Sequence, residues 1–69
     1  MAIEFEVQRL EVGDVVVTDL PEGGEGEATV ARPIDRADSS VRVTLRAAGA
    51  ADFVREWPLG ALVTVVRGP

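Results

Sequence analysis

The chain has 69 residues and a formal net charge of −5, with 12 acidic and 7 basic side chains, and 46% of its residues are hydrophobic. This composition is typical of one folded domain, which we place at residues 1–69. Cysteine, histidine, lysine and tyrosine are absent, which excludes disulfides and a structural zinc site and leaves few groups for catalysis. We therefore predict a protein that is not an enzyme and has no metal or cofactor.

We expect no targeting signal at the beginning of the chain. The segment Met-Ala-Ile-Glu-Phe-Glu places two acids where a secretory signal would carry lysine or arginine. No apolar run approaches the length that spans a membrane. We predict a cytoplasmic location and no membrane partner.

The first third of the chain predicts two strands and a loop. Ile3, Phe5 and Val7 alternate with polar residues, as in a strand with one wet face. A Gly-Asp turn at 13–14 then leads into the run 15–17, which is apolar on both faces and so must be covered on both sides. The N-terminal strand or a second subunit is the candidate cover. Residues 19–27 hold three glycines and a proline, which predicts a loop.

The remainder of the chain predicts further short strands. A strand is predicted at 28–32, which Pro33 either ends or confines to an edge of the sheet, and residues 35–40 are polar turn material. The clearest alternation in the chain predicts that Val41, Val43 and Leu45 point inward while Arg42, Thr44 and Arg46 point outward. Strands at 53–57 and 62–66 follow, separated by a break at 58–60, and no segment favours a long helix. The predicted fold class is all-β.

Five strands from residue 12 onward, with a long loop after the first and a proline-bearing break before the last, resemble the SH3-like barrel. That family makes a short 3₁₀ turn before its final strand. We expect a small barrel of five to six strands with an extra N-terminal strand. The pattern Leu10-x-x-Gly13-Asp14-x-Val16, followed by Val30 and Ile34, more narrowly resembles the KOW type of this barrel over residues 10–34. The resemblance implies nucleic-acid binding.

The charges are divided unevenly along the chain. Residues 1–27 hold eight acids and one arginine, whereas residues 28–69 hold six arginines and four acids. We predict that folding brings the two halves together as cross-strand Glu-Arg pairs; the alternative is a bipolar surface that favours head-to-tail contacts between subunits. The acids of the 19–27 loop would repel phosphate, and they leave open a solvated loop or a divalent-cation site.

Two sets of residues are candidates for a binding surface. Arg42, Arg46 and Arg55, combined with Trp57, could follow a nucleic-acid backbone while stacking a base. Trp57 and Phe53 are the second set, since SH3-like barrels often bind proline-rich peptides through a tryptophan and neighbouring aromatics. The alternative for these two residues is a place in the core or at its rim.

The function that these features favour is a non-enzymatic binding or assembly module. We predict that it acts through protein-protein contacts, as a homo-oligomer or docked on a larger protein, with Val16 and Val63 as interface residues. One alternative is a nucleic-acid-binding barrel that uses the arginine face. Another is an acidic mimic of nucleic acid that blocks a DNA-binding protein. The net charge of −5 disfavours direct nucleic-acid binding.

Overall fold

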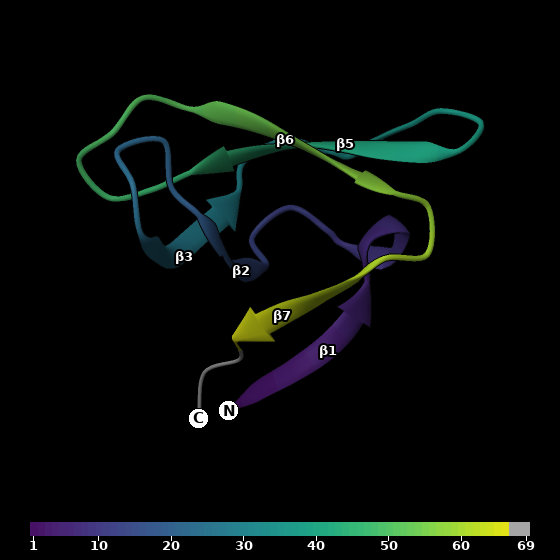
Figure 1. Cartoon of the computed structure of the whole chain (residues 1–69), viewed down its shortest axis with the longest axis horizontal. Helices are drawn as coiled ribbons and strands as arrows, with labels where there is room; N and C mark the ends of the chain where they lie inside the picture. The colour runs from purple at the N-terminus through teal and green to yellow at the C-terminus, as the bar shows by residue number, and fades with distance from the viewer. Residues whose placement is uncertain (67–69) are drawn as a thin grey trace.

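Seven short strands form one curled antiparallel sheet in the computed structural model, which describes residues 1–66 (Figure 1). The elements in chain order are β1 Ala2–Glu6, the 3₁₀ helix η1 Val7–Arg9, β2 Val15–Asp19, β3 Glu25–Val30, β4 Asp35–Arg36, β5 Ser40–Arg46, β6 Phe53–Pro58 and β7 Leu62–Val66. The predicted all-β class is confirmed, and the sheet curls into a half-barrel.

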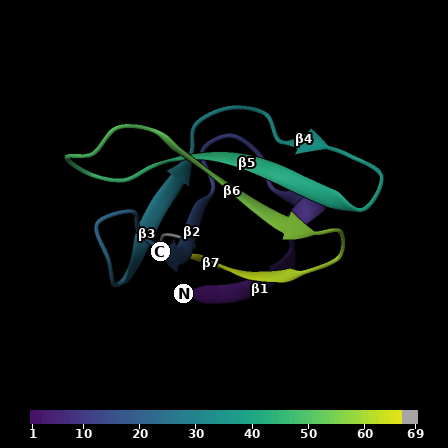
Figure 2. The same ribbon diagram turned by 45° about the horizontal axis from the view of Figure 1, so that its top comes forward.

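The strand order is β1-β7-β2-β3-β5-β4, with β6 also paired to β5. The strand β5 pairs with β6 on one side. On its other side β5 pairs with β3 at one end and with β4 at the other, so the sheet is six strands wide. β1 and β6 are the two edges. Figures 1 and 2 show the β1-β7 pair and the β5-β6 pair on opposite sides of the molecule. The N-terminal strand therefore pairs within its own sheet.

The predicted loop at 19–27 is shorter in the structure, and that boundary was wrong. Asp19 still belongs to β2 and pairs with Glu25, the first residue of β3. The turn itself is tight because Gly23 and Gly24 adopt positive φ angles of 104° and 74°. The Leu20 N–H donates to the Gly24 carbonyl across this turn at 2.9 Å. Because Gly23 and Gly24 make the turn, the residues on either side of it pair as far as Asp19 and Glu25.

Two further local expectations are corrected. The segment 35–40 was predicted as turn only, but Asp35 and Arg36 pair with β5 as β4. The break before the last strand is a hydrogen-bonded turn in which the Ala61 N–H donates to the Pro58 carbonyl at 3.0 Å. The 3₁₀ helix lies instead between β1 and β2, at residues 7–9.

The Gly-Asp turn before β2 has the predicted role. Gly13 has a φ of 97°, in the region that favours glycine. Its N–H donates to the Val30 carbonyl at 2.9 Å, and the Val30 N–H donates back to the Asp14 carbonyl at 2.8 Å. The Asp14 carboxylate accepts the Glu11 N–H at 2.9 Å. The turn thereby starts β2 and fastens it to β3.

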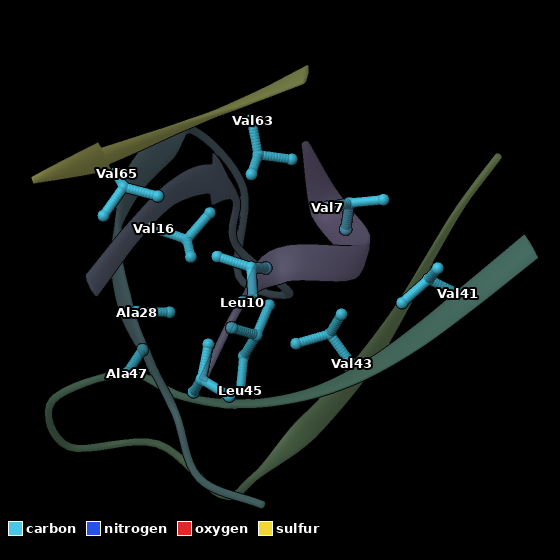
Figure 3. Packing of buried hydrophobic residues seen from close by; sticks show 11 residues of the cluster. Val7, Leu10, Val16, Ala28, Val41, Val43, Leu45, Ala47, Val63 and Val65 are labelled. Atoms are coloured by element: carbon cyan, nitrogen blue, oxygen red, sulfur yellow. The ribbon is translucent and has the colours of Figure 1, made fainter. Parts of the chain in front are cut away.

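The core fills the inner side of the curled sheet (Figure 3). Val41, Val43 and Leu45 on β5 are fully buried, which confirms the alternation predicted there. Val16 and Val63, predicted as interface residues, belong to the same core and are only 0% and 5% exposed. That part of the interface prediction is wrong, because the alternation along β2 and β7 turns these two side chains inward.

Candidate functional site

The four residues of the predicted nucleic-acid surface do not lie on one face of the sheet. In the β5-β6 pair, Trp57 is opposite Val41 and Arg55 is opposite Val43, both of which are core residues. Directly opposed residues project from the same face, so Trp57 and Arg55 lie on the inner face. Arg42 and Arg46 lie on the outer face, with the exposed residues of β5. The register of β5 and β6 therefore separates the arginine row from the tryptophan.

The two outer-face arginines are neutralised by acids of the same chain. Arg42 lies between Asp35, its cross-strand neighbour on β4, and Glu56 on β6, whose carboxylate is 3.8 Å away. Arg46 donates from Nε and Nη2 to the two carboxylate oxygens of Asp52 at 2.8 and 3.1 Å. This hydrogen-bonded pair lowers the pKa of Asp52 and raises the pKa of Arg46. The outer side of β5 is thus not a concentrated positive surface.

The inner-face residues of β6 close the edge of the core. Trp57 and Phe53 are half-buried and pack against the core cluster. Arg55 donates from Nη2 to the Asp19 carbonyl at 3.0 Å and places its guanidinium 5.0 Å from the centre of the Phe53 ring. Arg9 stacks similarly over Phe5 at the other edge, at 5.7 Å. Of the two alternatives for Trp57 and Phe53, the packing supports the rim of the core.

The acidic loop brings no set of metal ligands together. Among residues 1–66 no three acidic side chains converge on a point that could hold an ion, and no pocket opens on the surface. The same part of the chain contains no helix that is long and apolar enough to cross a membrane.

An apolar stripe lies on the outer face of the two neighbouring strands β7 and β2. We call it the outer stripe; its members alternate with buried core residues along each strand and are Val15, Val17, Leu62, Thr64 and Val66. The three valines and Thr64 are half-buried, and Leu62 is 59% exposed. Thr64 is the one polar member, so the stripe is largely hydrocarbon.

Glutamates border the outer stripe on both sides. Cross-strand pairing places Glu4 of β1, Thr64, Val17 and Glu27 of β3 in one continuous row over four strands. At one end of the stripe, Glu6 of β1 lies beside Leu62, and Glu25 of β3 lies beside the exposed Asp19 that follows Val17 on the outer side of β2. At the other end, Ala2 of β1 and Thr29 of β3 hold the corresponding positions. We call Glu4 and Glu6 the β1 rim and Glu25 and Glu27 the β3 rim. All four side chains are on exposed residues.

Among residues 1–66, the ion pairs do not join the N-terminal and C-terminal halves of the chain as predicted. The ion pairs of Arg42 with Glu56 and of Arg46 with Asp52 both lie within the C-terminal half. The four rim glutamates belong to the N-terminal half and share their face with the outer stripe. Folding therefore keeps much of the negative charge of the N-terminal half on one surface.

The sequence contained a signal for this surface. The runs 15–17 and 62–66 are apolar at consecutive positions except at Thr64, which indicates that both faces of those strands are largely apolar. The alternation fixes only which residues share a face, and the side that points inward depends on the packing of the whole sheet. Alternation alone is therefore compatible with Val16 and Val63 as the predicted interface residues, whereas in the structure Val15, Val17 and Leu62 are the outer residues.

No protein-family model matches the chain, and comparison with curated proteins and with solved structures found no significant similarity.

Proposed function

We propose that this chain is a non-enzymatic module that binds another protein chain through the outer stripe. One observation carries the proposal: two adjacent strands turn apolar side chains outward, with Leu62 59% exposed among them. A sheet whose two faces are both apolar is stable in water when a second layer covers each face. The core occupies the inner face, so the outer stripe fits a layer supplied by a partner.

The alternative functions are less well supported by the placement of charge. A nucleic-acid site needs arginines that are free to meet phosphates, whereas Arg42 and Arg46 are engaged by acids and Arg55 is on the other face. Two further predictions remain, self-association and action as an acidic mimic of nucleic acid. In both of them the chain would act by binding a protein. A cytoplasmic location also remains a prediction.

We also propose that the half-barrel is a variant of the SH3-like barrel with an added N-terminal strand. Support comes from the neighbour order β7-β2-β3-β5-β6, which leaves five antiparallel strands once β1 and the short β4 are set aside. The strand β1 then extends the sheet beyond β7. The narrower KOW resemblance at residues 10–34 stays a prediction.

The test compares two variants that place a charge at an exposed apolar position. Leu62→Asp changes the outer stripe, whereas Val54→Asp changes an apolar residue of β6 that is 48% exposed and lies outside the stripe. Each tagged protein is used to capture partners from a nuclease-treated lysate of its source at high salt, and captured proteins are quantified by mass spectrometry. We expect a defined protein to be captured by the wild type and by Val54→Asp and to be lost with Leu62→Asp.

Trp57 fluorescence serves as the folding control, since Trp57 packs against the core on the opposite face. The proposal is contradicted if folded Leu62→Asp captures the same proteins as the wild type. It is also contradicted if capture depends on nucleic acid and is lost after nuclease treatment.

A further inference from the structure

The outer stripe and its two rims together define the width and the charge of the surface that a partner would meet. The stripe is two strands wide, and the rims lie on the strands immediately beyond it. Neighbouring strands are about 4.8 Å apart, so Glu4 and Glu27, three strand spacings from each other, are separated by about 14 Å at the backbone. An α-helix with its side chains is about 10 to 12 Å in diameter. One helix therefore fits between the rims.

We infer that the occupant of the outer stripe is an amphipathic helix of a different protein, with its apolar side flanked by lysine or arginine. This inference rests on the proposed function and adds the chemistry of the partner. Apolar side chains of the helix would cover Val15, Val17 and Leu62. Basic side chains on its two flanks would reach the glutamates of the β1 and β3 rims, which gives the complex its orientation and its selectivity.

The length of the stripe is also suited to a short helix. From Leu62 to Val66 the strand advances four residues, or about 13 Å at 3.3 Å per residue. A helix rises 1.5 Å per residue, so about nine helical residues cover the stripe. That is two to three turns, which present three or four apolar side chains on one side.

A second copy of this chain fits the same surface poorly. In a symmetric dimer each subunit contributes the same patch, so when the two stripes are aligned a rim of one copy meets a rim of the other. Both rims carry glutamates, so this arrangement places glutamates against glutamates. Like charges that face one another across an interface are unfavourable, and they discriminate against the wrong partner.

A head-to-tail contact between copies lacks a basic surface to receive the rims. Arg42 and Arg46 are neutralised by neighbouring acids, and Arg55 donates to a backbone carbonyl on the inner side. Arg9 is stacked on Phe5. Of the other described arginines, Arg32 lies close enough to Asp52 to contribute to the lowered pKa of that carboxyl, and Arg36 stands apart on β4. The arginines of residues 1–66 are therefore dispersed, and a helix with two basic flanks has to come from another protein.

The inference is tested with purified protein and three synthetic peptides of about 16 residues. The first has leucines on one helical side and lysines on both flanks; the second replaces the lysines by glutamates; the third keeps the lysines and replaces the leucines by serines. Dissociation constants are measured by calorimetry at low and at physiological salt. We expect the lysine-leucine peptide to bind at least tenfold more tightly than the lysine-serine peptide, and the glutamate-leucine peptide not to bind.

Two double variants with the same change in net charge locate the contact. Glu4→Gln with Glu27→Gln removes one glutamate from each rim, in the same row. Glu11→Gln with Glu22→Gln removes two exposed acids from turns outside the stripe. We expect the rim variant to bind the lysine-leucine peptide about tenfold more weakly at low salt, and the turn variant to bind it within twofold of the wild type.

Several outcomes overturn the inference. Equal binding of the glutamate-leucine peptide would mean that the rims do not select the partner, and equal weakening by both double variants would mean non-specific attraction. Failure of the lysine-leucine peptide to bind would also overturn it. A dimer detected by light scattering and abolished by Leu62→Asp would identify the occupant as a second copy, which contradicts the inference but leaves the proposed function intact. Capture of the same proteins by folded Leu62→Asp and by the wild type would instead contradict the proposed function itself.

Discussion

The assignment of inner and outer faces on β2 leads to a quantitative prediction about adjacent valines. Val16 is fully buried and Val17 is half-buried, although the two side chains are identical. Val16→Ala removes two buried carbon groups, each contributing about 0.8 kcal/mol, and leaves a cavity that the neighbouring strands fill only in part. We expect a loss of about 2 to 3 kcal/mol in the free energy of unfolding. Val17→Ala should cost about 1 kcal/mol or less.

Urea unfolding followed by the fluorescence of Trp57 measures both losses, and the dependence on urea should be the same for both variants. Val16→Asp goes further, because an unpaired carboxylate in the core costs more than the few kcal/mol that hold a domain of this size together. We expect that variant to be unfolded. The reasoning is refuted if Val17→Ala destabilises more than Val16→Ala, since a register shift of one residue exchanges the two faces.

Three other results follow from the structure. Trp57→Ala should destabilise the fold by about 2 kcal/mol because it opens the rim of the core; since the chain has one tryptophan, urea unfolding of this variant is followed by circular dichroism. The variant should leave partner capture unchanged, and loss of capture in folded protein would restore Trp57 as a binding residue. Gly13→Ala should cost about 1 kcal/mol in thermal or urea unfolding because Gly13 has a φ of 97°, and an unchanged midpoint would contradict the turn geometry. The hydrogen bond from Arg46 lowers the pKa of Asp52, so this carboxylate stabilises the fold above its unfolded-state pKa, and the contribution is lost as the pH falls through the lowered folded-state pKa. An NMR titration of the Asp52 carboxyl should show the lowered midpoint in the wild type and an ordinary one in Arg46→Ala.

Much of the fold could be predicted because its signals are local. The alternation of Val41, Val43 and Leu45 with polar neighbours indicates a strand with one buried face, and the Gly13-Asp14 turn indicates where β2 begins. The strands of the β2-β3 hairpin extend further than the sequence predicts, for a physical reason. Composition averaged over 19–27 predicts a loop, whereas only Gly23 and Gly24 adopt the turn conformation and the residues around them pair.

The candidate site could not be predicted because it depends on register. Arg42 and Trp57 are both at positions where a strand alternation is visible, yet only the pairing of β5 with β6 shows that they face opposite sides. The row from Glu4 to Glu27 likewise depends on β7, which is far along the sequence from β1 and β2 and pairs with both of them. Long-range pairing of this kind leaves no trace in a local pattern.

The most direct test of the outer stripe as the binding surface is an NMR map of the contact. Uniformly ¹⁵N-labelled protein is titrated with the lysine-leucine peptide, or with the captured partner, and backbone amide shifts are followed. The structure predicts that the largest shifts fall on β7 and β2, at Leu62, Thr64, Val17 and their neighbours, with Trp57 unaffected. Shifts centred on Trp57 and the inner side of β6, or on the arginines of β5, would contradict the account.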